Sequence, residues 1–311
     1  MKYIFFGTPE FAAIVLEKLI NSGYTPAAVV CNPDEPVGRK QILAPPPAKI
    51  IAQKYNVSVF QPVNKSELSA ISHKLSAIKP DLAIIAAYGK ILPKEILNIP
   101  SRGFINVHGS LLPAYRGASP IQMAILNGDK ETGVTIMEVD EEMDHGPILG
   151  KSEIRISKSE TYETLSKKLA ELGAELLIKT IPDYISGKIK PREQDHLKAT
   201  YTKIIKKEDG KIDWIKSAEN IERMTRAYYP WPSAWTTWNE KILKILEADI
   251  SKYKNNFQIG KLFLTNDNEL AVKCGNNNLI VKKLQLEGGK ILSAKEFLNG
   301  HRDFIGSVLN S

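Results

Sequence analysis

The residues in this sequence best suited to chemistry are an amide and an imidazole at one end of an apolar run. The segment 104–108 predicts a short strand that carries Asn106 and His108 and runs into a loop broken by Gly109 and Pro113. Because side chains alternate between the two faces of a strand, Asn106 and His108 share a face. In an open α/β sheet, ligands bind at the edge where such strands end. The N–H groups of an amide and an imidazole can together hold an oxygen that becomes negative, so the pair predicts an oxyanion site.

A carboxylate on a separate loop completes the candidate catalytic set. Asp144 follows the predicted strand 132–139, and the nearby Gly146 allows a tight backbone path. A carboxylate beside an imidazole fixes its tautomer and raises its basicity. We therefore expect Asp144 to move a proton, directly or through a water, while Asn106 and His108 face the oxyanion. The alternative is that Asn106 caps a turn and His108 is an ordinary loop histidine, but a polar pair inside an apolar strand favours the catalytic interpretation.

The nucleophile is expected to come from the substrate. No serine or cysteine lies in a recognisable nucleophile turn, which favours acyl transfer to an amine over hydrolysis through an acyl-enzyme. Cys31 and Cys274 lie far apart and have no partner at metal-ligand spacing. We therefore expect neither a disulfide framework nor a metal site, as in proteins of the reducing cytoplasm.

Alternating strands and helices predict the fold that positions this site. The first 188 residues predict a Rossmann-like α/β domain with a parallel sheet. The dinucleotide fingerprint is absent from the first turn, since Pro9 and Ala12 stand where two glycines belong, and an NAD site is disfavoured. The expected strands are 2–6, 27–31, 57–60, 81–86, 104–108 and 132–139, and the expected helices include one that Thr8 caps, one at 120–126 and one at 159–179.

The rest of the chain predicts a linker and a second domain. Periodicity fades over residues 189–203, which we interpret as an interdomain linker. Residues 204–311 predict short strands with asparagine and glycine turns and one helix at 218–227, typical of a small β-barrel of the OB type that often binds nucleic acid. Residues 201–311 hold 18 Lys and Arg against 13 Asp and Glu, most of the net charge of +7. This excess fits a polyanionic partner, and it fits equally well a lysine-rich surface that serves solubility.

Composition and the N-terminus indicate where the protein works. A hydrophobic content of 43% and a charged content of 25% are those of a soluble globular protein. The N-terminal run predicts a first strand and is too short for a signal peptide, and no apolar run approaches the length of a membrane span. We expect a cytoplasmic monomer.

Several segments resemble the folate-dependent formyltransferases. The run 106–113, Asn-Val-His-Gly-Ser-Leu-Leu-Pro, continued by 115–118, is similar to that family's signature, and the segment 133–146 is similar to its second motif. In the C-terminal part, 211–214 and 226–232 resemble the members that act on initiator tRNA. The resemblance extends over nearly the whole chain.

This resemblance implies the transfer of a formyl group from 10-formyltetrahydrofolate to the α-amine of methionine on initiator tRNA. Asn106, His108 and Asp144 match the catalytic positions of the family. The formylated folate would contact two loops, through Ser110, Leu111, Leu112 and Pro113 and through Tyr88, Gly89, Ile91 and Leu92.

The tRNA contacts are expected in two basic segments. By resemblance, the loop 32–49 reaches the acceptor end of the tRNA with Arg39 and Lys40, although Glu35, Gln41 and Ile42 stand where family members tend to carry basic residues. The proline and glycine content of this loop predicts few backbone hydrogen bonds and mobility without tRNA. A second basic run is expected to contact phosphates rather than to form a solvated face, and it contains Lys203, Lys206 and Lys207.

Two other functions stay open on the sequence. One is another folate enzyme, such as a sugar N-formyltransferase or a formyltetrahydrofolate hydrolase, whose C-terminal domain would lack the basic character and the Tyr-Pro-Trp-Pro motif at 229–232. The other is a nucleic-acid-binding protein without activity, which would leave the Asn106–His108 pair unexplained.

Overall fold

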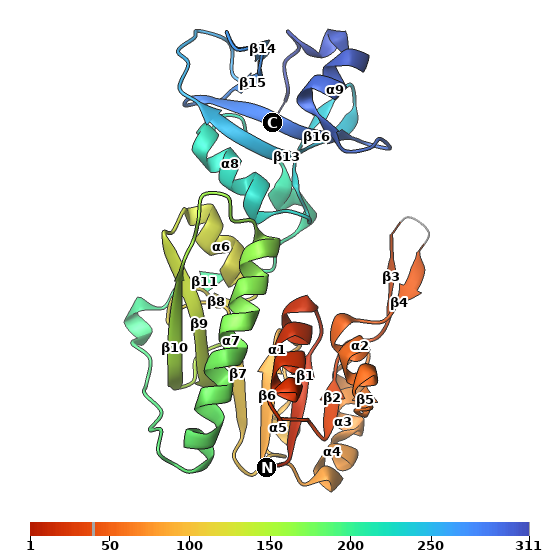
Figure 1. Cartoon of the computed structure of the whole chain (residues 1–311), viewed down its shortest axis with the longest axis vertical. Coiled ribbons are helices and arrows are strands. Elements are labelled where there is room, and N and C mark those ends of the chain that lie inside the picture. The colour runs from red at the N-terminus through yellow and green to blue at the C-terminus, as the bar shows by residue number, and fades with distance from the viewer. Residues whose placement is uncertain (39–40, 311) are drawn as a thin grey trace. The chain divides into compact units, whose positions relative to one another are not determined.

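The chain forms two compact units in the computed structural model, which describes residues 1–38 and 41–310. Figure 1 shows the helices and strands of both units. No helix within the described residues is long and apolar enough to cross a membrane. The N-terminal unit comprises Met1–Pro120, Glu131–Arg155 and Ser166–Lys203, and the C-terminal unit comprises Ile121–Lys130, Ile156–Leu165 and the chain from Ile204 onward.

A mixed sheet of seven strands forms the centre of the N-terminal unit, in the order β10-β9-β7-β6-β1-β2-β5. The predicted Rossmann-like architecture is confirmed by its parallel strands, which are β1 (Tyr3–Gly7), β2 (Ala28–Val30), β5 (Val59–Phe60), β6 (Leu82–Ala86) and β7 (Phe104–His108). The expectation of a wholly parallel sheet is wrong at one edge. There β9 (Glu131–Glu138) runs antiparallel to β7 and to an unpredicted strand, β10 (Ile148–Arg155). An antiparallel edge is common on otherwise parallel sheets, because an edge strand can be joined by a short connection.

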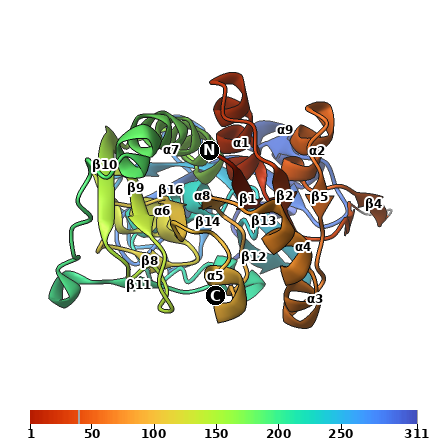
Figure 2. The same cartoon turned by 90° about the horizontal axis from the view of Figure 1, so that it is seen from below.

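Helices cover both faces of this sheet, as Figure 2 shows. Phe104 of β7 belongs to a core cluster on one face, whereas Val107 faces Gly173, where an added Cβ would lie 2.6 Å from Val107 Cγ1. Because side chains alternate along the strand, Asn106 and His108 lie on the face of Phe104, as predicted. One face is covered by α1 (Glu10–Asn21), α2 (Pro47–Lys54) and α7 (Tyr162–Ile185), and the other by α3 (Lys65–Ala70), α4 (Ser72–Ile78) and α5 (Lys94–Leu97).

The loop 32–49 contains a hairpin. The strand β3 (Glu35–Val37) pairs antiparallel with β4 (Ile42–Ala44). The ammonium group of Lys49 lies 2.7 Å from a carboxylate oxygen of Asp34, at the base of the hairpin. The expectation of few backbone hydrogen bonds is therefore wrong for the described part of this loop, since its two strands bond to each other.

An antiparallel sheet curled into half a barrel forms the core of the C-terminal unit. Its order is β12-β13-β16-β15-β14, with β17 beside β16. Near the C-terminus, Asn310 bridges to Thr237 and Val308 bridges to Lys261, so the tail links the two edges of the sheet. The predicted small β-domain is confirmed. Its elements are α6 (Pro120–Asn127), α8 (Ala218–Ala227), β12 (Ala234–Trp238), β13 (Lys241–Ser251), β14 (Leu262–Leu264), β15 (Leu270–Lys273), β16 (Asn278–Leu286), β17 (Leu292–Ser293) and α9 (Ala294–Gly300).

Candidate active site

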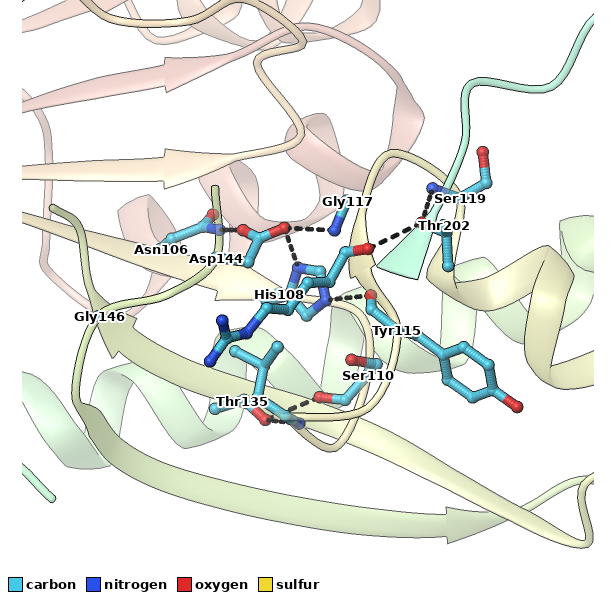
Figure 3. A network of polar contacts seen from close by, with 12 residues as sticks. Asn106, His108, Ser110, Tyr115, Gly117, Ser119, Thr135, Asp144, Gly146 and Thr202 are labelled. Carbon is cyan, nitrogen blue, oxygen red and sulfur yellow. Dashed lines mark hydrogen bonds and ion pairs between the residues drawn. The ribbon is translucent and has the colours of Figure 1, made fainter. Parts of the chain in front are cut away.

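The structure brings the three predicted catalytic residues together at the carboxyl end of β7 (Figure 3). The Asn106 amide donates to Asp144 Oδ1 at 3.3 Å. Asp144 Oδ2 lies 3.5 Å from His108 Nδ1 and accepts a hydrogen bond from the Gly117 main-chain N–H at 2.7 Å. The side chains of His108 and Asp144 are 5% and 14% exposed. The carboxylate is thus held among three N–H-bearing groups while little water reaches it.

The His108 ring has an acceptor beside each nitrogen. Its Nε2 lies 3.1 Å from the Tyr115 carbonyl oxygen, which can only accept, so this nitrogen carries a proton. Its Nδ1 faces the Asp144 carboxylate. A second proton on Nδ1 would therefore be shared with Asp144, and the ring cannot turn away without losing its bond to Tyr115. The His108–Asp144 pair is arranged to carry a proton between them.

The backbone at Asp144 is in the left-handed region, with φ +51°. Aspartate tolerates this conformation better than most residues. The chain then turns closely past Glu138, because a Cβ on Gly146 would lie 2.2 Å from the Glu138 carbonyl oxygen. The predicted tight path after Asp144 is present, and it aims the carboxylate at β7.

The loop after β7 is bonded to the neighbouring strand. Thr135 of β9 donates through Oγ1 to the Ser110 carbonyl oxygen at 2.7 Å and accepts from the Leu112 N–H at 3.1 Å. The Lys151 ammonium of β10 donates to the Leu112 carbonyl oxygen. Ser110 Oγ donates to the Ala114 carbonyl oxygen at 2.6 Å. The loop is therefore fixed by hydrogen bonds from β9 and β10. Thr135 and Lys151 were not predicted, because their partners are distant in sequence.

Two buried polar atoms at this edge lack a hydrogen-bond partner. Among the described residues, Asn106 Oδ1 and the Tyr88 hydroxyl are buried and have no hydrogen-bond partner. Tyr88 follows β6, whose Ile85 pairs with Asn106. Burial raises the pKa of Tyr88 to about 12, so its hydroxyl keeps its proton at neutral pH. An acceptor and a donor left unpaired inside a protein are costly.

The residues predicted to contact the folate differ in how exposed they are. The side chains of Ser110, Leu112 and Tyr88 are buried against the protein itself. The side chain of Ile91 is 76% exposed, and Gly89 is exposed with φ +79°. Half-buried side chains complete the predicted set at Leu92, Leu111 and Pro113.

Residues 200–202 of the predicted linker, here called the strap, pair with the loop that follows β7. The strand β11 (Tyr201–Thr202) pairs parallel with β8 (Arg116–Gly117). The Thr200 hydroxyl accepts from the Tyr115 N–H at 2.8 Å, and the Thr200 carbonyl accepts from the Arg116 N–H at 2.8 Å. Thr202 Oγ1 accepts from the Ser119 N–H at 3.0 Å. Residues 200–202 thus hold the segment that carries Tyr115 O and the Gly117 N–H, a role that no local pattern in the sequence signals.

The predicted tRNA contacts are placed only in part. Lys203, Lys206 and Lys207 are exposed. Arg39 and Lys40 lie outside the described residues.

Neither cysteine has the surroundings of a nucleophile. Cys31 and Cys274 are buried and are not joined by a disulfide. Burial raises the pKa of each thiol to about 12, so both stay protonated at neutral pH. Within residues 1–38 and 41–310, no group of three or more His, Cys, Asp and Glu side chains is placed to hold a metal ion.

Comparison with known proteins relates both parts of the chain to one family. Residues 1–181 match the family Formyl transferase, and residues 204–302 match the family Formyl transferase, C-terminal domain. The chain is 46% identical over 313 residues to the methionyl-tRNA formyltransferase of Caldicellulosiruptor saccharolyticus, with 100% of both chains covered. It is 42% identical to the methionyl-tRNA formyltransferase of Bacillus velezensis, with 99% of this chain and 97% of that protein covered.

Solved structures share the fold. The N-formyltransferase from Helicobacter canadensis in complex with folinic acid and dTDP-3-aminofucose has a TM-score of 0.67 and 19% identity, over 90% of this chain and 98% of that one. The methionyl-tRNA formyltransferase from Clostridium thermocellum has a TM-score of 0.56 and 20% identity, over 82% of this chain and 95% of that one. At these identities the likeness concerns the fold alone.

The contact between the strap and the site loop is testable at Gly117. This residue has φ +108°, and a Cβ on it would lie 2.5 Å from the Thr202 carbonyl oxygen. We expect Gly117→Ala to lower the free energy of unfolding by roughly 2–4 kcal/mol, through backbone strain and the clash with β11. The matched control is Gly23→Ala, at φ +88° with nothing within 4 Å, which should cost only the backbone strain of about 1 kcal/mol. Urea unfolding of both variants measures the difference, and equal losses would mean that β11 does not press on Gly117.

Proposed function

Since this chain belongs to the formyl transferase family, we propose that it transfers the formyl group of 10-formyltetrahydrofolate to the α-amine of methionine on initiator tRNA. The observation that carries this proposal is the Asn106–His108–Asp144 set at the end of β7. The chain also matches methionyl-tRNA formyltransferases from end to end. The structural neighbour that binds dTDP-3-aminofucose is related to the chain by fold alone, which gives a sugar substrate less support.

The chemistry of the proposed reaction assigns a role to each residue of the set. Transfer of a formyl group to an amine requires that the amine lose a proton and that negative charge on the formyl oxygen be held. When bound, the folate donor supplies the formyl carbon. Asp144 accepts the proton of the attacking amine, directly or through a water, and shares it with His108 Nδ1 at 3.5 Å. As the new bond to the amine forms, the bond between the formyl carbon and the donor nitrogen breaks, and the proton held by this pair passes to that leaving nitrogen. The Asn106 amide has a second N–H beyond the one bonded to Asp144, and this N–H donates to the formyl oxygen.

The folate is proposed to bind between the loops that follow β6 and β7. The buried side chains of Ser110, Leu112 and Tyr88 would shape the floor of this site, while the exposed Ile91 would cover the ligand. Asn106 Oδ1 and the Tyr88 hydroxyl support this placement, because both are buried at this edge and each lacks a hydrogen-bond partner among the described residues. Leu111, Pro113, Gly89 and Leu92 complete the proposed contacts.

The proposal divides the work along the chain. Residues 1–188 would perform the transfer, and residues 189–203 would connect this part to the rest of the chain. Residues 204–311 would bind the tRNA together with Arg39 and Lys40. The basic excess of residues 201–311 supports this division. The proposed enzyme would act as a monomer, in the cytoplasm where initiator tRNA is charged.

The proposal predicts large losses of turnover at two positions. Asn106→Ala and His108→Ala should each lower kcat by about 10²–10³, the first because it removes a donor to the developing oxyanion and the second because it removes the imidazole that shares the proton with Asp144. The assay supplies 10-formyltetrahydrofolate and methionyl initiator tRNA and measures formylmethionyl-tRNA. Folding should survive, because Ile105 and Val107 carry the packing face of β7.

His73→Ala is the control for these variants, since His73 is an exposed histidine on α4. It should keep parental turnover. Parental turnover in Asn106→Ala or His108→Ala would remove that residue from the catalytic set. If the parent protein formylated an amino sugar but not methionyl-tRNA, the proposed substrate would be wrong.

The tRNA proposal predicts a charge effect at Lys206 and Lys207. Replacing both by Ala should weaken tRNA binding and lower the slope of log Kd against log salt by up to about two, since each phosphate contact releases about one counterion. Folate affinity should not change. The matched control replaces Lys290 and Lys295, two exposed lysines of the same unit. Equal salt slopes for both double variants would show that the lysine run at 203–207 has no special part in tRNA binding.

A further inference from the structure

One glutamine of the predicted linker is buried although its neighbours are not. Gln194 is 5% exposed, while Glu193 and Asp195 on either side are exposed. A glutamine in a flexible connection would lie in water, so this burial indicates that Gln194 has specific partners.

All the hydrogen-bonding capacity of the Gln194 amide is used. Its Nε2 donates to the Asp144 carbonyl oxygen at 2.9 Å and to the Gly146 carbonyl oxygen at 2.8 Å. Its Oε1 accepts from Arg116 Nη2 at 2.8 Å and from Arg116 Nε at 3.2 Å. An amide has two N–H donors and two lone pairs on its oxygen, so no capacity is left for water.

Arg116 is itself immobilised by other residues of the predicted linker. Its side chain is buried, with the residue 2% exposed. Its Nη2 lies 2.8 Å from His196 Nδ1, and its Nη1 lies 3.5 Å from the Tyr201 hydroxyl. Its main-chain N–H bonds to Thr200. A buried guanidinium with this many partners is a rigid support for Gln194.

Hydrogen bonds therefore hold both the carboxylate and the main-chain carbonyl oxygen of Asp144. Its carboxylate accepts from the Gly117 N–H, and Gly117 directly follows Arg116. Its carbonyl oxygen accepts from Gln194, which Arg116 orients. The conformation of Asp144 at φ +51° carries a backbone cost that these bonds offset. Release of the carbonyl would let the peptide planes turn, and the carboxylate would move away from His108.

We infer that Gln194 is a positioning residue for the transfer reaction: its amide fixes the main chain at Asp144 and Gly146, so that the Asp144 carboxylate keeps its place beside His108 and Asn106. This inference rests on the proposed function for its kinetic consequence. Gln194 touches no reacting atom. It acts through the two carbonyl oxygens, so the segment 192–202 that carries it helps to position the catalytic residues.

Gln194→Glu is the most direct test. The side chain keeps its size and still accepts from Arg116, but an acceptor replaces the two N–H donors that face the carbonyl oxygens of Asp144 and Gly146. We expect kcat to fall by about 10²-fold, the cost of misplacing a reacting group by about 1 Å. The KM values for the folate and for tRNA should stay within about twofold of the parent, because no proposed binding residue changes. Amide hydrogen exchange of residues 140–147 should become faster.

The C-terminal unit offers a matched control. Asn278 is fully buried, and its amide likewise donates to two carbonyl oxygens, those of Ser251 at 3.2 Å and Tyr253 at 2.7 Å. Asn278→Asp makes the same chemical change and should lower the melting temperature comparably while kcat is kept. Gln194→Met, which removes the polar atoms without adding charge, serves as the second variant if Gln194→Glu does not fold, and it should show the same loss of kcat.

Three kinetic results would overturn the inference: parental kcat in a folded Gln194 variant, an equal loss of kcat in Asn278→Asp, or a loss that appears in KM with kcat unchanged. The exchange measurement separates this inference from the proposed function. If the parent formylates no methionyl-tRNA but exchange at 140–147 still rises in Gln194→Glu, the function fails and the positioning contact stands. Unchanged exchange would overturn the contact whatever the parent does.

Discussion

The hydrogen bond from the Gly117 main-chain N–H to the Asp144 carboxylate is the interaction on which the rest of the site depends. It joins two loops, one after β7 and one after β9, and brings Asp144 within 3.5 Å of His108. A main-chain donor has no rotamer freedom, so its direction is set by the backbone path alone. That path is set in turn by β11, which pairs with β8 at Gly117. The Asp144 carboxylate thus has a fixed position, although its backbone is in the left-handed region and its loop is otherwise exposed.

The parts of the fold that follow from local periodicity could be predicted from the sequence. Alternation along β7 placed Asn106 and His108 on one face, and apolar runs located β1, β6 and β7 to within about a residue of their bounds. The helix at 218–227 was predicted at its observed bounds, because Ser217 accepts from the Asn220 N–H as its cap and the helix buries one face. These features depend on residues close in sequence, which is why pattern reasoning reaches them.

The parts that depend on distant partners could not be predicted. Thr8 was expected to cap α1, but its hydroxyl accepts from the Asn32 N–H and donates to the Tyr88 carbonyl, and Pro9 stands at the cap position. The direction of β9 depends on which strand it meets. Gln194 gives no signal at all, because the three residues that it hydrogen-bonds lie 48, 50 and 78 residues away along the chain. The local pattern gave the three catalytic candidates, and the resemblance to a family matched them, but neither gave the residues that hold them.

The central claim is that the Asp144 carboxylate, fixed by Gly117 and Gln194, takes the proton that the attacking amine loses during formyl transfer. Its most direct test is the single-turnover rate of Asp144→Asn with 10-formyltetrahydrofolate and methionyl initiator tRNA. Asparagine tolerates φ +51° and can still accept from the Gly117 N–H, but it cannot take a proton. We predict a rate lower by about 10²–10⁴ with the affinity for both substrates unchanged. A rate near that of the parent would contradict the account.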